Sequence, residues 1–168
     1  MMRVICNRVL RQFGQSYPDA DNSLQHWRRQ VESRDYLSFA DLRSAFGSVD
    51  LVGDRMIFDI RGNRYRLITY MDLIRQVCFV KDFLTHDQYD RGKWMKAKTV
   101  KEDGGFFWTT PHHPRAAFEL NTPDDYDVAV LAIDKLVNDG AINHQHPHND
   151  LFMSLFDAIH AYEKVHYP

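Results

Sequence analysis

The sequence predicts an α+β protein, in which a small mixed domain is followed by a linker and an α-helical hairpin. Apolar residues recur at helical spacing up to about residue 46, and the pattern then changes to three β-rich runs. From residue 92 to 117 no period is sustained, and Gly, Pro and charged residues dominate. Helical spacing returns beyond this stretch. We therefore expect a domain at 1–91, a linker at 92–117 and a helical hairpin at 118–168.

Three helices are expected in the first domain, after a short strand at about 3–6. The first helix ends at "SYPD", because proline and aspartate favour a turn there. The second runs from about 21 to 34 with one apolar face. The third begins with a serine N-cap and ends at a glycine, which takes the left-handed backbone that often closes a helix. The residues that define these helices are Val9, Leu10, Phe13, Leu24, Trp27, Val31, Ser38, Leu42, Phe46 and Gly47.

An antiparallel meander of three strands follows, formed by "RMIFDI", "RYRLITYMD" and "QVCFVKDFL". Gly62 and Asn63 are a signal for a two-residue hairpin between the first two strands. A second turn is expected near Leu73 to Arg75. Strand, helices and then a meander describe a small α+β domain.

The second part contains two helices. Thr122 is the expected N-cap of the first, with Pro123 at its first position and Asp125 in an acid-favouring first turn. This helix ends near Gly140, and Asn149 is expected to cap the next one. Because two helices of this length have too small a core to be secure alone, the hairpin must pack on the rest of the chain. Its apolar positions are Tyr126, Val130, Ile133, Val137, Leu151, Leu155, Ile159 and Tyr162.

The net charge of −2 conceals a division between the two parts of the chain. Residues 1–100 hold seventeen Lys and Arg against twelve Asp and Glu, a net charge of +5. Residues 101–168 hold four Lys and Arg against eleven Asp and Glu, a net charge of −7. A basic unit tied to an acidic one favours a nucleic-acid binder that carries its own acidic mask. The alternative is chance bias between two solvated surfaces.

The composition is that of a globular protein outside membranes. No apolar run approaches the roughly eighteen residues of a membrane span, and the start "MMRVICNRVLRQF" lacks the apolar region of a signal peptide. We therefore expect a cytoplasmic protein that has no membrane contact. Cys6 and Cys78 lack the spacing of a zinc site or a redox pair, and we expect both to be buried thiols.

Cations gather on one expected face of the meander. Because side chains alternate along a strand, Arg66 should lie on the face opposite the helices. The last strand should place Val77, Phe79, Lys81 and Phe83 together, so that Lys81 can stand beside Arg66. Two such cations would seat a phosphate group. The alternative is an exposed face on which the Arg and Lys side chains serve only solubility.

The segment "THDQYD" follows the last strand directly. Thr85 can cap a helical turn, from which His86 and Tyr89 project on one face. Together with the cations they suit RNA cleavage without a metal: a base deprotonates the ribose 2′-OH, cations hold the phosphorane charge, and an acid protonates the leaving 5′-oxygen. An ordinary polar role for His86 is the alternative.

We expect neither a metal nor a cofactor. "HQHPH" at 144–148 and the pair His112 and His113 lie in expected loops, without carboxylate or thiolate ligands at fixed spacing. The sequence contains neither a phosphate-binding glycine loop nor a G-x-S-x-G elbow.

The runs "SAFGSVD", "IRGNRYRLI" and "THDQYD" resemble HigB-type toxins of bacterial toxin-antitoxin systems, over nearly all of residues 2–91. Asp59, Gly47 and Gln88 depart from that pattern, where Asn, Pro and Glu are common. The resemblance implies a RelE-like α+β fold and a ribosome-dependent mRNA interferase. It implies catalytic roles for Arg66, Lys81, His86 and Tyr89, and on this basis we expect RNA contacts from Arg61, Asn63, Arg64, Arg91 and Lys93.

The second part is similar to the N-terminal segment of HigA-type antitoxins, through "TPDDYDVAVLAIDKLVND" and the ending "AYEKVHYP". In that family a DNA-binding domain follows, whereas this sequence stops at Pro168, so we expect no direct DNA binding. The resemblance implies a toxin restrained by its own antitoxin-like segment, with exchange of the hairpin between copies as a possible route to homo-oligomers. An inactive interaction or regulatory module is the alternative. The expected neutralising residues are Tyr126, Val130, Ile133, Leu155, Ile159 and Tyr162.

Overall fold

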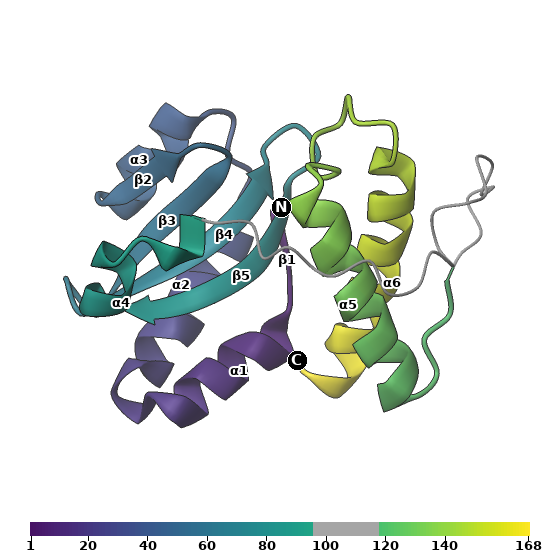
Figure 1. Cartoon of the computed structure of the whole chain (residues 1–168), viewed down its shortest axis with the longest axis horizontal. Coiled ribbons are helices and arrows are strands. Elements are labelled where there is room, and N and C mark those ends of the chain that lie inside the picture. Colours follow the sequence, from purple (N-terminus) through teal and green to yellow (C-terminus); the bar gives the residue numbers. More distant parts are fainter. Residues whose placement is uncertain (96–117) are drawn as a thin grey trace.

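The computed structural model describes residues 1–95 and 118–168 (Figure 1). Most of the expected linker, 92–117, lies outside these residues, and its first four residues include a short 3-10 helix. Within the described ranges, none of the helices combines the length and the apolar character that crossing a bilayer requires.

The α+β class is confirmed. The elements in chain order are β1 (Arg3–Ile5), α1 (Asn7–Ser16), η1 (Pro18–Ala20), α2 (Asp21–Glu32), α3 (Phe39–Phe46), β2 (Val49–Val52), β3 (Arg55–Ile60), β4 (Tyr65–Asp72), β5 (Val77–Thr85), α4 (His86–Asp90), η2 (Lys93–Met95), α5 (Pro123–Asn138) and α6 (Asn149–His166).

The strands form one five-stranded sheet in the order β1-β5-β4-β3-β2. Strand β1 pairs with β5 in parallel, and the other neighbours are antiparallel. Strand β2 was not predicted, so the meander has four strands instead of three. A run as short as "VDLV" carries little alternation, and Gly53, with φ of 61°, provides the turn that returns the chain into β3.

The connection between β3 and β4 also differs from the prediction. Ile60 pairs with Tyr65, so the loop contains four residues instead of the expected Gly62-Asn63 pair. Arg61 and Gly62 both take left-handed backbone, with φ of 55° and 62°. Arg61 thereby leaves the strand, and its guanidinium reaches Asp19 in η1.

A β-bulge interrupts the pairing of β4 with β5. Ile68 pairs with Asp82 and Thr69 with Val80, so Lys81 is an extra residue. The bulge reverses the side-chain alternation along β5. The prediction that Phe79, Lys81 and Phe83 share one face is therefore wrong, because Phe83 pairs with Leu67 and Phe79 with Tyr70.

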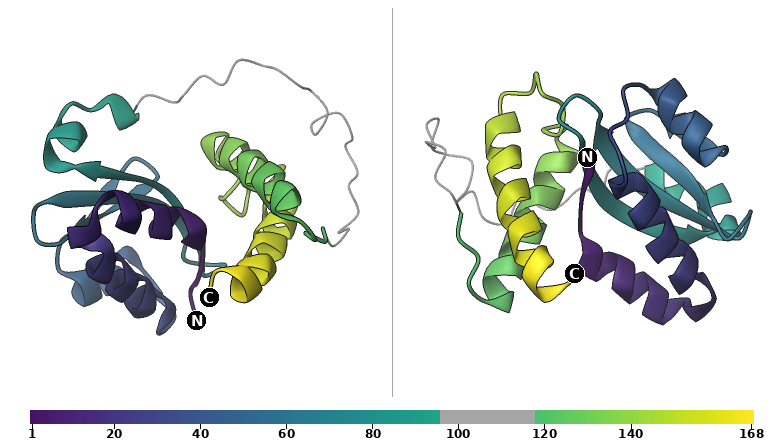
Figure 2. Two further views of the ribbon diagram at one scale, coloured as in Figure 1. Left: turned by 90° about the horizontal axis from the view of Figure 1, so that it is seen from below. Right: turned by 180° about the vertical axis from the view of Figure 1, so that it is seen from behind.

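Helices α1 and α2 cover one face of the sheet, and α4 lies on the other side (Figure 2). The covered face has an aromatic core, in which Phe13 stacks on Phe83 at 5.4 Å between ring centroids, and Trp27 meets Phe58 at 5.3 Å. We call the opposite face the α4 face. It carries Arg55, Ile57 and Asp59 of β3 and Arg66, Ile68 and Tyr70 of β4.

The hairpin of α5 and α6 packs beside the β1 edge of the sheet (Figure 1). Its N-terminal cap is confirmed: Thr122 and Asp125 form a capping box, and Pro123 is the first helical residue. The apolar stripe merges with the core of the first domain into one cluster. Of the six expected neutralising residues, Val130 is half-buried, and Tyr126, Ile133, Leu155, Ile159 and Tyr162 are buried.

Asn149 does not cap α6 as expected, because it is the first helical residue and follows the N-cap His148. Its buried side-chain amide donates to the carbonyl oxygens of Ala141, at 2.9 Å, and Ile142, at 3.3 Å. Asn149 therefore fixes the loop before α6. Cys6 and Cys78 are buried free thiols, as expected, and burial raises the pKa of each.

Candidate active site

Arg66 lies near the start of β4 on the α4 face, opposite Asp59 of β3. Its Nε is 3.0 Å from Asp59 Oδ1, and its side chain is 12% exposed. The guanidinium also donates to the backbone and side-chain oxygens of Asn63. These contacts fix its direction, with its guanidinium carbon 5.5 Å from the centre of the Tyr89 ring.

Tyr89 belongs to a series of stacked groups on the α4 face. Its ring lies 4.9 Å from that of Trp94, with 15° between the planes. Trp94 Nε1 donates to the Tyr89 carbonyl at 2.9 Å, which ties η2 to α4. Arg55 lies over Trp94 at 5.6 Å and donates from Nε to Tyr70 Oη at 2.9 Å. The series Arg66, Tyr89, Trp94 and Arg55 therefore joins both long central strands to the segment after β5.

The Tyr89 phenol is held in its protonated form. Partial burial raises its pKa above the ordinary value, and Asp50 adds to this effect, whereas Arg66 opposes it. A neutral phenol beside a guanidinium can donate a proton or a hydrogen bond to a phosphate oxygen.

His86 begins α4 directly after β5. Thr85 caps this helix as expected, and Gln88 completes a capping box. The imidazole Nδ1 lies 3.0 Å from Asp90 Oδ2, and the side chain is 42% exposed. The carboxylate can orient the ring.

Lys81 stands in the bulge of β5, and its amino group pairs with Asp134 of α5. It is not beside Arg66, because the residue opposite Arg66 is Leu84. Lys81 instead borders a cleft of about 270 Å³, which also involves Arg55 and Trp94. The structure thus brings Arg66 and Tyr89 into contact and places Lys81 farther along the sheet.

Two of the expected RNA-binding arginines contact the helical side of the domain. Arg61 and Arg64 lie 2.6 Å and 2.9 Å from the carboxylate of Asp19, which also accepts from Tyr65 Oη at 2.9 Å. The Tyr65 hydrogen bond, followed by the two arginines, lowers the pKa of Asp19. These contacts give both arginines a role in joining the β3–β4 loop to η1.

The remaining expected RNA contacts are dispersed. Asn63 orients Arg66, Arg91 is exposed at the end of α4, and Lys93 borders the cleft beside Trp94. Arg55 and Trp94 were not among the predicted site residues. The β-strand alternation that places Asp59 on the α4 face places Arg55 there too, but Trp94 lies in the segment that was assigned to the linker.

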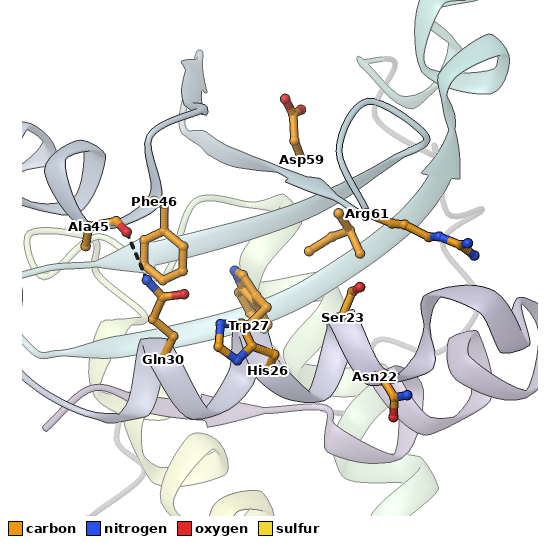
Figure 3. A pocket seen from close by; sticks show the side chains of 10 residues that line it. Asn22, Ser23, His26, Trp27, Gln30, Ala45, Phe46, Asp59 and Arg61 are labelled. Carbon is orange, nitrogen blue, oxygen red and sulfur yellow. Dashed lines mark hydrogen bonds between the residues drawn. The ribbon is translucent and has the colours of Figure 1, made fainter.

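A second cavity, of about 330 Å³, lies between α2, α3 and β3 (Figure 3). His26, Trp27 and Gln30 of α2 border it, and Gln30 Nε2 closes one side by donating to Ala45 O at 2.9 Å. Figure 3 shows Asp59 directed away from these helical side chains. Most of its lining therefore comes from the helical side of the sheet, although Asp59 also belongs to the α4 face. Among residues 1–95 and 118–168 there is no cluster of three or more His, Cys, Asp or Glu side chains that could hold a metal ion.

Comparison with known proteins assigns the first domain. Residues 20–92 match the HigB toxin family, described as the RelE-like toxic component of a toxin-antitoxin system. The mRNA interferase HigB of Escherichia coli O6:H1 (strain CFT073) is 26% identical over 93 residues, which cover 54% of this chain and 90% of that protein. The mRNA interferase toxin HigB of Escherichia coli K12 and the mRNA interferase HigB of Shigella flexneri are each 22% identical over 92 residues, 53% of this chain and 88% of theirs. The family match contains Arg66, Lys81, His86 and Tyr89 and ends before α5. Residues 20–92 therefore identify the first part of this chain as similar to the HigB-type, RelE-like toxins.

Proposed function

We propose that this chain is an mRNA interferase, a metal-independent endoribonuclease that cleaves messenger RNA on the ribosome in the cytoplasm and is held latent by residues 118–168. The observation that carries the proposal is the contact of Arg66 with Tyr89 on the α4 face of a HigB-type domain. The names of the relatives, which are mRNA interferases, support the reaction.

The proposed reaction uses the 2′-oxygen of the ribose as nucleophile. A base, for which His86 is the candidate, removes its proton, and the 2′-oxygen attacks the adjacent phosphorus. Arg66 stabilises the charge on the phosphorane oxygens, and Lys81, farther along the sheet, holds a neighbouring phosphate of the RNA. The bond from phosphorus to the 5′-oxygen breaks, and Tyr89 gives its proton to that leaving oxygen. The products are a 2′,3′-cyclic phosphate and a 5′-hydroxyl.

Latency is proposed to depend on one contact with this site and on several anchors outside it. The site contact is the ion pair of Lys81 with Asp134, in which a carboxylate stands where an RNA phosphate would bind. The anchors lie on β1 and α1: Arg3 pairs with Asp157 and Arg8 with Asp127, each at 2.5 Å. The +5 and −7 net charges of the two parts favour the same docking.

The start of α1 is a further anchor. Its N-cap, Cys6, provides no side-chain hydrogen bond, and the first amides of a helix need acceptors. Glu163 of α6 is buried near this end of α1; burial raises the pKa of its carboxyl group, and the Tyr126 hydrogen bond and the nearby Asn7 and Arg8 amides oppose that rise. Tyr126 Oη donates to Glu163 Oε1 at 2.5 Å. A buried carboxyl group of the hairpin thus lies near the uncapped start of the toxin helix.

This arrangement supports an antitoxin-like role for α5 and α6 toward their own chain. The same surface of β1 and α1 would accept the hairpin of a second copy, and a separate antitoxin would have to displace α5 and α6 to reach it. Direct DNA contact is not part of the proposal.

The test is induced expression of the full-length chain in a bacterium, together with variants that weaken the anchors. Asp127→Asn combined with Glu163→Ala should arrest growth and deplete messenger RNA, and adding Arg66→Ala should restore growth. Equal growth of all three strains at matched soluble protein levels would reject the nuclease.

The alternative function is a catalytically inactive interaction module. The ion pairs of Arg66 with Asp59 and of Lys81 with Asp134 favour it, because both candidate catalytic cations are already neutralised. In that case the anchor variants should alter binding to other proteins but leave messenger RNA intact.

A further inference from the structure

The cleft between β5, η2 and α5 has features that the proposed cleavage step does not use. Its volume of about 270 Å³ is just below the range of about 300–1,000 Å³ that suits drug-sized ligands, so it fits a fragment of a larger molecule. Trp94 and Arg55 line one part of it, and Lys81, Lys93 and Asp82 add charges of both signs. The apolar lining consists of Ile68 together with Val9 and Phe13 of α1.

We propose that this cleft is a nucleobase subsite, in which one base of the bound RNA stacks on the Arg55 guanidinium, which continues the stack of Tyr89 and Trp94, and presents an amino group to Asp82. The inference rests on the proposed function, because it assigns a binding position for the same RNA. It adds a determinant of base preference to a site in which Arg66 binds the reacting phosphate.

The wall of the cleft is fixed in advance. The Trp94 ring is held by its stack on Tyr89 and by the hydrogen bond from its Nε1 to the Tyr89 carbonyl. The Arg55 guanidinium is held by Tyr70 Oη. Indole rings and guanidinium planes are the groups on which proteins stack unpaired bases, and a rigid platform loses little entropy on binding.

The charges suit the parts of a nucleotide that surround its base. Lys81 and Lys93 border the cleft and can contact the phosphates on either side of a seated base. Asp82 is an acceptor only, since its ionised carboxylate can receive the amino group of cytosine, adenine or guanine but repels the carbonyl oxygens of uracil. The subsite should therefore prefer bases with an exocyclic amino group.

Helix α5 closes the cleft from the other side. Asp134 and Asn138 border it together with the toxin residues. Docking of α5 thus places a carboxylate among Lys81, Lys93 and Arg55. Asp134→Asn removes this competing charge while leaving the anchors on β1 and α1 in place, so the full-length Asp134→Asn chain is the parent for the test.

The test is calorimetric titration of that parent with 2′-O-methyl trinucleotides of adenosine, cytidine or uridine, at one fixed salt concentration. These probes cannot be cleaved, because the 2′-hydroxyl is blocked. Trp94→Leu should weaken binding of the adenosine and cytidine probes on the order of tenfold or more. Trp94→Phe should retain most of the affinity, which separates stacking from loss of structure. Asp82→Asn should abolish the preference over uridine.

Met95→Leu is the matched control, because Met95 is an exposed residue of η2 that does not border the cleft. The Met95→Leu chain should bind the trinucleotide probes as tightly as the parent does. The inference is overturned if the parent does not bind the probes, or if Trp94→Leu binds them as tightly as Met95→Leu does. Binding without any messenger RNA cleavage would reject the proposed nuclease and leave the subsite standing.

Discussion

Lys81 of β5 and Asp134 of α5 form an ion pair that joins the two parts of the chain at the border of the candidate active site. Lys81 is 19% exposed and Asp134 is 34% exposed, so the pair is only partly shielded from solvent. The anchors of the hairpin, in contrast, lie at β1 and the start of α1. Neutralisation of a site cation and attachment of the hairpin are thus carried by different residues, which can be varied separately.

Asp134→Asn in the full-length chain should increase messenger RNA cleavage, because Lys81 becomes available to phosphate while the anchors remain. We expect a partial effect, since α5 still borders the cleft. Cleavage is measured on ribosomes programmed with a defined message. Asp124→Asn is the matched control, because it removes one exposed acidic charge from the same helix. Equal cleavage by both variants would show that the Lys81–Asp134 pair does not restrain the site.

Glu163→Ala should lower the free energy of unfolding by about 1–3 kcal/mol, because it leaves the buried Tyr126 hydroxyl without its acceptor. Urea denaturation of the full-length chain gives this quantity. Glu119→Ala, at an exposed position before α5, should change it by no more than about 0.5 kcal/mol. If the two variants have the same stability, Glu163 is not an anchor of the hairpin.

Arg66→Ala should reduce messenger RNA cleavage about a hundredfold to a thousandfold in an anchor-weakened chain, because it removes one fixed charge from the transition state. Arg64→Ala should reduce it little, since Arg64 pairs with Asp19 at 63% exposure and such surface pairs contribute at most about 1 kcal/mol. Similar losses in both variants would mean that the whole β3–β4 loop binds RNA.

Local signals predicted the parts of this fold that depend on local chemistry. The caps at Ser38 and Thr122 and the glycine at the end of α3 follow from one to four neighbouring residues, and each lies where it was expected. The strand β2 was missed because four residues give too short a pattern. Asparagine is a common N-cap residue, but the side-chain amide of Asn149 instead donates a hydrogen bond to the loop before α6.

The candidate site was harder to predict because its geometry depends on pairing between strands. An insertion of one residue, Lys81, changes which side chains share a face, and no sequence pattern marks this bulge. The partner of Lys81 lies fifty-three positions away in another helix, so only docking of the two parts identifies Asp134. The left-handed backbone at Arg61 likewise decides that two arginines meet Asp19 instead of the α4 face.

His160 of α6 should make the stability of the chain depend on pH in the acidic range. Burial lowers its pKa to about 4, and the nearby Lys164, Arg3 and Arg28 act in the same direction, whereas Asp157 opposes them. In the unfolded chain the imidazole regains its ordinary pKa of 6.5. Between these values the unfolded state binds more protons, so the contribution of His160 is fully present above pH 6.5 and is lost as the pH falls to about 4.

The measurement is the free energy of unfolding in urea at several pH values between 7 and 4, for the unaltered chain and for His160→Gln. The difference between the two proteins cancels the titration of the acids that both share, including Glu163. Because His160 is only half-buried, we expect this difference to change by roughly 1–2 kcal/mol across the range. His26→Gln, at an exposed position on α2, should show no such change. A difference for His160→Gln that is constant from pH 7 to pH 4 would contradict the prediction, because it would mean that the imidazole takes up protons equally in both states.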